Sequence, residues 1–288
     1  MPLAAMPLIA VPLAAMPLAA MPLGVVPVML LLGSGALVGI TLGLIGGGGS
    51  VLAVPLLVYV VGVPSAHVAI GSAAVAVAFN AGAGLATHAR LGTVKWPCAL
   101  VFTAAGVAGA FAGASLGKQL GGAELLALFG VVMIGVGIYM LSVRPKPAGH
   151  DVRLTAESAG RLLPRLLLFG AGVGLLSGFF GIGGGFLIVP GLMLATGMAL
   201  QNAIGTSLFA VTAFGLATAT SYAFSGLVDW RLAALVIVGG VLGTLLGTRV
   251  NAQLATHKRT LASTFAAIVI SVGLYIITSG IVKLVAAS

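Results

Sequence analysis

The feature that most constrains the fold is the near absence of charge over long stretches of the chain. Residues 1–89 contain no Asp, Glu, Lys or Arg, and the 63 residues between Arg165 and Asp229 contain none either. Only 6% of the 288 residues are charged, whereas a soluble domain carries about 25%. So little charge cannot cover a surface exposed to water, which excludes a soluble enzyme, and 60% hydrophobic residues exclude a disordered chain. We therefore expect an all-α polytopic membrane protein, because apolar runs of about 18 residues or more form membrane-spanning helices.

The positive charge of the chain does not predict nucleic-acid binding. The net charge is +9, but the cations lie in short clusters between apolar runs, which is typical of the cytoplasmic loops of membrane proteins. The single cysteine, Cys98, cannot form an internal disulfide, and no cluster of Cys and His indicates a metal. No cofactor is expected. The expected partners are a small anionic substrate and the lipid bilayer, and the sequence leaves open whether copies of the chain form a homo-oligomer.

The first 30 residues form a low-complexity leader of proline-containing pentads. Proline recurs at every fifth residue from Pro2 to Pro27. Each proline inside a helix costs about 3 kcal/mol, so residues 1–30 are not expected to be an ordinary membrane span. The segment also lacks the basic region of a signal peptide, and no function is assigned to it.

The rest of the chain is an internal repeat, with an offset of 135 residues that becomes 134 further along. Duplicated halves are typical of secondary transporters. We predict a first transmembrane repeat at 31–142, a polar basic linker at 143–165 and a second transmembrane repeat at 166–288. The matching segments are Gly46–Pro55 with Gly181–Pro190, Ile70–Ser72 with Ile204–Thr206, and Trp96 with Trp230.

The first apolar block of each half is too long and too rich in glycine to be one regular helix. The blocks cover about residues 33–62 and 167–197. A helix of about 30 residues would be about 45 Å long, against a hydrocarbon core of about 30 Å. The central glycines lower helix stability by about 1 kcal/mol each. Each block is therefore expected to be two short helices joined by an unwound segment that is buried in protein or lines a wet cavity.

Two topologies follow from this break. If each block spans the membrane once, the repeats are parallel, with nine Lys and Arg residues in the cytoplasm and four outside. If each block folds back as a hairpin, the repeats are inverted, and the split is ten inside and three outside. The positive-inside rule favours the hairpin by one charge, so we predict two homologous halves with broken helices in an inverted arrangement.

The glycine-rich breaks are the candidate substrate site. A helix that begins after such a break presents free N–H groups and about half a positive charge, and glycine lets the backbone approach an anion closely. The alternative is that these glycines only allow close helix packing. Hydroxyl groups near the start of the following helix and one amide are further candidates, with hydrogen bonding within or between helices as the alternative. The candidate substrate-binding residues are Gly46, Gly47, Gly48, Gly49, Ser50, Ser72, Asn80, Gly181, Gly183, Gly184, Gly185, Thr206 and Ser207.

A second set of glycines is predicted to pack helices against one another. Small residues at intervals of three or four let two helix backbones approach closely inside a membrane. These glycines also recur in both halves of the repeat. They are Gly106, Gly109 and Gly113, with Gly240, Gly243 and Gly247.

Taken together, the motifs resemble the TauE/SafE family of bacterial membrane permeases. The likeness covers about residues 33–283. The family is associated with export of sulfite and of organosulfonates such as sulfoacetate, so the resemblance implies a multi-pass protein of the bacterial inner membrane. The first half departs from the pattern, because Lys95 stands where the second half has Asp229. The residues that carry the resemblance are Gly46–Pro55, Gly181–Pro190, Gly71–Ser72, Gly205–Ser207 and Gly226–Arg231.

The sequence thus predicts a secondary transporter that exports a small sulfur-containing anion, such as sulfite or an organosulfonate, bound between the two breaks. Rocking of one half against the other would give alternating access. The chain has no Walker A motif to bind ATP and no HExxH motif, and no serine is paired with a histidine in mid-span, so it is not expected to be an enzyme. Two alternatives stay open: a permease for another small anion, and a membrane scaffold that transports nothing.

Overall fold

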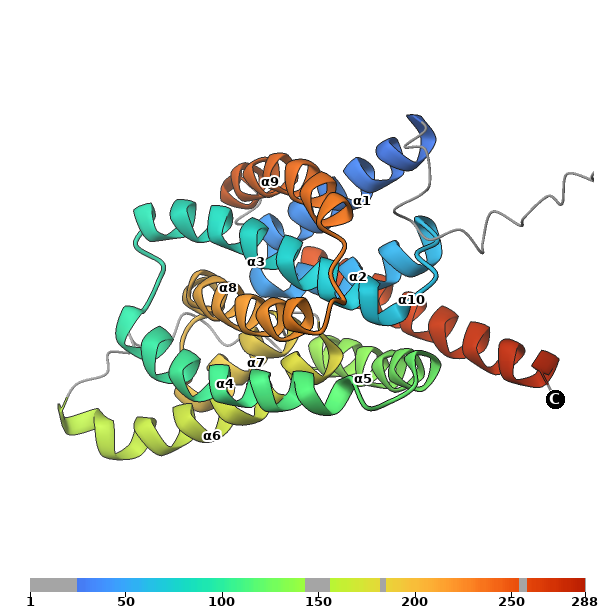
Figure 1. Ribbon diagram of the computed structural model, residues 1–288. Coiled ribbons are helices and arrows are strands. Elements are labelled where there is room, and N and C mark those ends of the chain that lie inside the picture. Colours follow the sequence, from blue (N-terminus) through green and yellow to red (C-terminus); the bar gives the residue numbers. More distant parts are fainter. Residues whose placement is uncertain (1–24, 143–155, 182–184, 254–257, 288) are drawn as a thin grey trace, which may run out of the picture.

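The computed structural model describes residues 25–142, 156–181, 185–253 and 258–287. These residues form helices and no strand (Figure 1). Seven helical segments among them are long and apolar enough to cross a membrane. The expected all-α polytopic architecture is therefore confirmed. Residues 1–24 of the expected leader and residues 143–155 of the expected linker lie outside the described residues.

The two halves contain corresponding helices in the same order. The first half contains α1 (Val25–Ile45), the 3₁₀ segment η3 (Gly46–Leu52), α2 (Ala53–Pro55), the π-helical η4 (Leu56–Val60), α3 (Ala66–Arg90), α4 (Trp96–Gly117) and α5 (Gly122–Ser142). The second half contains α6 (Ala156–Phe180), α7 (Gly185–Thr196), α8 (Leu200–Phe224), α9 (Trp230–Gln253) and α10 (Lys258–Ala287). Helix α1 corresponds to α6, α3 to α8, α4 to α9, and α5 to α10.

Two helices begin earlier than the sequence patterns predict. Helix α1 begins at Val25, inside the expected leader, with Pro27 in its first turn, where a backbone N–H has no intrahelical partner to lose. Helix α6 begins at Ala156, inside the linker expected at 143–165. Apolar content marks where a chain enters lipid, whereas a helix continues into polar turns as long as its backbone hydrogen bonds are made.

The first apolar block of each half folds back on itself. At the turns, Gly46 has a φ of 73° and Gly181 a φ of 67°, a backbone conformation that favours glycine. After the first turn the hydroxyl of Thr41 lies 3.4 Å from the carbonyl oxygen of Gly49, although a regular helix would separate residues eight apart by about 12 Å. In the second half, a Cβ on Gly191 of α7 would lie 3.1 Å from the side chain of Val173 in α6. Each block is a helical hairpin.

The two halves pack through reciprocal contacts between equivalent helices. Helix α1 lies along α9, and its counterpart α6 lies along α4, on the opposite side of the molecule (Figure 1). Between them α3 packs against its own counterpart α8, and α5 packs against α10. Reciprocal pairing of this kind indicates an internal pseudo-two-fold axis between the halves.

The contacts also give the direction of each helix. Helices α1, α3 and α9 run one way, and α4, α6 and α8 run the other way. The counterparts α1 and α6 therefore point in opposite directions, which is what inverted repeats require. Their orientation across a membrane stays a prediction. The contacts that give these directions are Gly35–Val236 with Gly43–Gly247, Gly109–Ala171 with Gly117–Phe179, Gly71–Leu227 with Gly84–Thr244, Lys95–Thr206 with Gly106–Phe214, and Gly84–Leu208 with Gly215–Ala74.

The second set of glycines packs helices closely, as predicted. A Cβ on Gly109 of α4 would lie 2.8 Å from the backbone nitrogen of Leu175 in α6. A Cβ on Gly247 of α9 would lie 3.0 Å from the Cα of Ile40 in α1. No side chain fits at these positions, so the helix backbones touch. Such close approach supplies van der Waals attraction between helices in lipid, where the hydrophobic effect does not hold them together.

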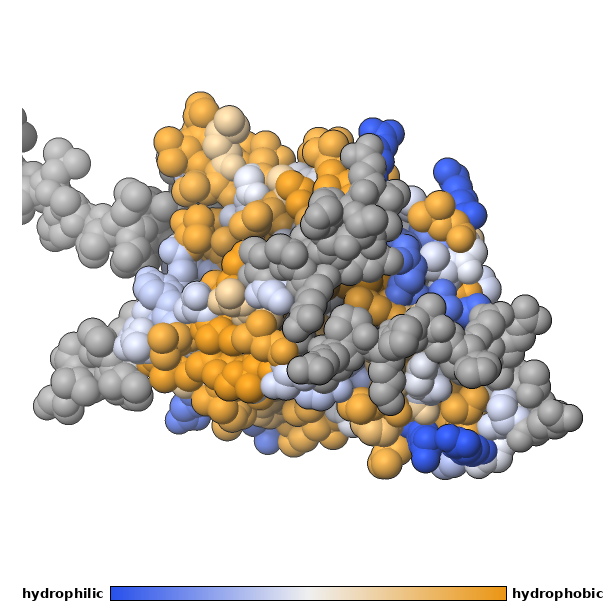
Figure 2. Space-filling view, turned by 180° about the vertical axis from the view of Figure 1, so that it is seen from behind, coloured by the Kyte–Doolittle hydropathy of each residue, from blue (hydrophilic) through white to orange (hydrophobic). Residues whose placement is uncertain are grey.

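The outer surface of the molecule is apolar over broad areas. Figure 2 shows continuous hydrophobic patches on the face seen from behind. Large apolar side chains such as Leu168 on α6 and Leu242 on α9 are exposed. A surface of this kind is suited to contact with lipid, and the protein is a multi-pass integral membrane protein.

Candidate functional site

The two glycine-rich breaks meet in the interior of the molecule. A Cβ on Gly47 would lie 2.7 Å from the Cα of Gly185, and a Cβ on Gly185 would lie 2.7 Å from the Cα of Gly47. All residues of Gly46–Leu52 are buried, and Gly185 and Phe186 at the start of α7 are buried as well. The main chains of the two halves therefore touch directly, with no side chain between them.

Each break also rests on a helix of the other half. A Cβ on Gly46 would lie 2.7 Å from Cγ2 of Ile204 in α8, and a Cβ on Gly181 would overlap Cγ2 of Ile70 in α3. The two isoleucines occupy equivalent positions in the repeat. Each turn therefore requires glycine for two reasons: the backbone has a positive φ, and the isoleucine side chain leaves no room for a Cβ.

Two serines hold the first break in place. The backbone N–H of Gly47 donates to Ser207 Oγ at 3.3 Å, and the Ser207 hydroxyl donates to the carbonyl oxygen of Ile204 at 2.7 Å. The Ser50 hydroxyl donates to the carbonyl oxygen of Gly47 at 2.9 Å. Both serines are fully buried. The structure therefore brings Gly46, Gly47, Ser50, Gly185 and Ser207 of the predicted set together.

The second break leads into a helix start. Helix α7 begins at Gly185 and continues for 12 residues. The first N–H groups of a helix have no acceptor within the helix and carry partial positive charge. Gly183 and Gly184, which the sequence analysis also selects, lie outside the described residues. Gly48 and Gly49 lie in the buried 3₁₀ segment η3 of the first break.

Ser72 and Thr206 bind the loops between helices. The backbone N–H of Asp229 donates to Ser72 Oγ at 2.9 Å, and the backbone N–H of Lys95 donates to Thr206 Oγ1 at 3.0 Å. The glycine before each hydroxyl makes room for the same loop, with Gly71 against Leu227 and Gly205 against Thr93. The repeated pair of a glycine and a hydroxyl residue thus anchors the loops before α9 and α4, and sequence patterns alone did not reveal this role.

Asn80 lies apart from the breaks, near the middle of α3. Its side chain is fully buried, and neither Oδ1 nor Nδ2 has a hydrogen-bond partner. The amide lies against Gly240 of α9. At the equivalent position of the second half, Phe214 lies against Gly106.

The sequence analysis missed one polar side chain beside Asn80. Thr244 of α9 is fully buried, and its hydroxyl has no hydrogen-bond partner. It stands four residues after Gly240 on the small-residue face that was assigned to packing alone. A hydroxyl residue inside such a face is the signal that could have singled it out.

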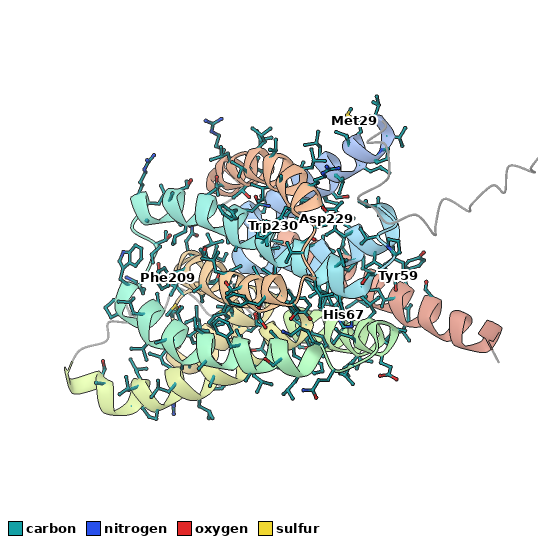
Figure 3. The ribbon with its side chains drawn as sticks, in the orientation of Figure 1. Met29, Tyr59, His67, Phe209, Asp229 and Trp230 are labelled. Carbon is teal, nitrogen blue, oxygen red and sulfur yellow. The ribbon has the colours of Figure 1, made fainter. Side chains whose placement is uncertain are left out.

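The ends of the molecule carry ionic and aromatic anchors. In Figure 3 Phe209 lies towards one end, and Tyr59, His67 and Asp229 lie towards the other. Lys118 caps the last turn of α8, because its Nζ donates to the carbonyl oxygen of Ser221 at 3.1 Å and to the hydroxyl of Ser225 at 3.0 Å. The described residues contain no group of three or more His, Cys, Asp or Glu that could hold a metal ion.

An all-helical membrane protein with two related halves, whose broken helices meet at the centre, is built in the manner of a secondary transporter. The chain belongs to the TauE/SafE family, because the profile of the family described as "Sulfite exporter TauE/SafE" matches residues 31–276.

Relatives with similar sequences are also described as membrane transporters. A "Probable membrane transporter protein" of Xylella fastidiosa (strain Temecula1) is 47% identical over 262 residues, which cover 90% of this chain and 98% of that protein. The "Probable membrane transporter protein YunE" of Bacillus subtilis is 27% identical over 272 residues, covering 88% and 98% of the two chains. No solved structure matches the chain. The protein is a membrane transporter.

Proposed function

We propose that the protein exports a small sulfur-containing anion, such as sulfite or an organosulfonate, and that this anion binds where the two breaks meet. The observation that carries the proposal is the contact between the main chains of Gly47 and Gly185 at the centre of the molecule. Two breaks in direct contact, one from each half, lie where movement of one half against the other would open or close a path. The family's description as a sulfite exporter supports sulfite as substrate and export as direction.

The chemistry of the breaks suits an oxyanion. Backbone N–H groups at a helix start bind anions without a charged side chain, and α7 starts at the contact. None of the seven Lys and Arg residues between Arg90 and Arg249 whose burial is described is buried. Attraction by backbone dipoles alone is weak, which suits a transporter that must release what it binds.

In this structure, the contact between the two breaks closes the path that we propose for the anion. The main chains of Gly47 and Gly185 are so close that not even a Cβ fits between them. The anion therefore enters only when the halves move apart at this point. The hydrogen bond from the Gly47 N–H to Ser207 lies within the same contact and holds the first break in its position there.

Transport in proteoliposomes tests the proposal. Purified protein is reconstituted, and uptake of labelled sulfite and sulfoacetate is compared with uptake of phosphate and formate. We expect a sulfur anion to accumulate well above protein-free liposomes. If only phosphate or formate accumulates, or if well-folded protein moves none of the four anions, the substrate assignment is wrong.

Two serine substitutions test whether transport depends on the breaks. Ser207→Ala removes the acceptor of the Gly47 N–H, and we expect sulfite transport to fall by about fivefold to tenfold, the size of one lost hydrogen bond. The matched control is Ser115→Ala, because the exposed Ser115 hydroxyl donates only to the carbonyl oxygen of Phe111 in its own helix. Equal transport by both variants would place the substrate away from the breaks.

A further inference from the structure

The contact between α3 and α9, here called the seam, contains two buried polar side chains without a hydrogen-bond partner. Asn80 Oδ1 and Nδ2 and Thr244 Oγ1 have no hydrogen-bond partner, and both side chains are 0% exposed. Asn80 is about 21 Å from the first residue of α3 and about 15 Å from the last, at about 1.5 Å per residue. Buried polar groups are normally hydrogen-bonded, so a pair without partners at this depth points to a ligand.

The two side chains belong to one layer of the seam. The Asn80 amide lies against Gly240, and Thr244 follows Gly240 by one turn of α9. Gly84 follows Asn80 by one turn of α3, and a Cβ on Gly84 would lie 3.1 Å from Cγ2 of Thr244. A third helix closes the layer, because a Cβ on Gly39 of α1 would lie 2.8 Å from the backbone nitrogen of Thr244. Three helices with a glycine each thus surround the polar pair.

In the equivalent seam, between α4 and α8, an aromatic ring takes the place of the amide, and the buried hydroxyls of Thr103 and Thr218 on these helices also have no hydrogen-bond partner. Phe214 stands at the position equivalent to Asn80, and Ala110 at the position equivalent to Thr244. The Phe214 ring fills the space against Gly106 and stacks on Phe102, with 6.2 Å between ring centroids. The fold therefore accepts an aromatic side chain in this place, and packing alone does not require an amide at position 80.

We infer that Asn80 and Thr244 form a subsite for the oxygen atoms of the transported anion, halfway along a path between α3 and α9. The inference rests on the proposed function and adds that the amide is present in one seam only, since Phe214 stands at the equivalent position of the other seam. The Asn80 Nδ2 carries two N–H donors and the Thr244 hydroxyl one O–H donor, which suits a sulfur oxyanion. Neutral donors hold an anion only weakly, so that it can move on.

The test compares the Michaelis constant for sulfite in the wild type, Asn80→Leu and Thr244→Val. We expect the constant to rise by about tenfold or more in each variant, the effect of a lost hydrogen bond to a charged group. The matched control is Thr212→Val, because the half-buried Thr212 hydroxyl already donates to the carbonyl oxygen of Leu208 in its own helix. Asn80→Leu is expected to fold, since the equivalent position holds Phe214.

Two further measurements separate the outcomes. Sulfite should raise the melting temperature of the wild type in detergent, and Asn80→Leu should lose that shift. Uptake is also measured in sodium and in choline salts, because Asn80 Oδ1 and Thr244 Oγ1 could instead bind a sodium ion. If the variants lose only a stimulation by sodium, or keep the wild-type constant for sulfite, the subsite assignment is wrong while the proposed function stands. If the wild type transports no sulfur anion, the proposed function fails and the subsite fails with it.

Discussion

At the scale of single residues, hydroxyl groups that look alike in the sequence have different surroundings. Ser207 and Ser50 bond to the first glycine-rich break, whereas Ser72 and Thr206 accept N–H groups of the loops before α9 and α4. All four are buried; Ser72, Thr206 and Ser207 were selected as hydroxyls near the start of an apolar helix, and Ser50 as part of the first break. Only the first pair is placed to act on the contact between Gly47 and Gly185.

This difference predicts a loss of stability without a loss of affinity. Ser72→Ala leaves the backbone N–H of Asp229 without its acceptor, which should cost about 1–3 kcal/mol and lower the melting temperature in detergent. The Michaelis constant for sulfite should stay at the wild-type value. Thr220→Val is the control, because the exposed Thr220 hydroxyl donates within its own helix, to Leu216. A stable Ser72→Ala protein with weakened sulfite affinity would show that the hydroxyl touches substrate.

At the scale of elements, the two hairpins are determined by a few glycines. A positive φ at Gly46 and Gly181 turns the chain back towards the end from which it came. The 3₁₀ segment η3 then runs back along α1 and packs on it, where Gly49 lies against Thr41 and Leu42. Bare backbone is tolerated at this depth because all of η3 is buried in protein.

Two glycines with similar φ values distinguish conformational strain from lost space. Gly46 and Gly62 have φ values of 73° and 82°, so an alanine at either position is strained by about 1–2 kcal/mol. A Cβ at Gly62 meets nothing within 4 Å, whereas a Cβ at Gly46 would collide with Ile204. We expect Gly46→Ala to lose folded protein and transport, and Gly62→Ala to show only a small drop in melting temperature. Similar behaviour of the two variants, measured by size-exclusion chromatography and sulfite uptake, would contradict a tight contact at Gly46.

At the scale of the whole molecule, the helix directions and the distribution of cations together indicate which end faces the cytoplasm. Helices α3 and α9 end, and α4, α6 and α8 begin, at the same end of the molecule. Among residues 66–118, 156–181 and 200–253, that end carries five cations, and the opposite end carries Lys118 and Arg231. This is the uneven distribution that the positive-inside rule associates with the cytoplasmic side. The five cations are Arg90, Lys95, Arg161, Arg165 and Arg249.

Cysteine labelling in cells checks this orientation. In a Cys98→Ala background, Ser65→Cys and Ser225→Cys should react with a membrane-impermeant thiol reagent added outside, and Leu91→Cys only after permeabilisation. All three positions are exposed, and Cys98 is buried. A single span in place of each hairpin would put Ser65 and Ser225 on opposite sides of the membrane. Labelling of only one of the two from outside would therefore exclude inverted repeats.

Much of this protein can be predicted from the sequence because the decisive signals are local. The charge-free stretches determine that the chain spans a membrane, and the repeated motifs determine that it has two related halves. The glycine runs determine where the helices break, since an unfavourable helix propensity acts within a few residues. The spacing of small residues likewise predicts which helix faces pack closely, and Gly109 and Gly247 confirm it.

The composition of the site was decided by contacts between residues far apart in the chain. No local pattern states that Gly47 meets Gly185 and Ser207, that Ser72 receives the N–H of Asp229, or that Thr244 lies beside the seam of Asn80. These neighbours depend on the pairing of α1 with α9, of α4 with α6 and of α3 with α8. Hydrogen bonds and close packing act over a few ångströms in space, whereas the partners are separated by more than a hundred residues along the chain.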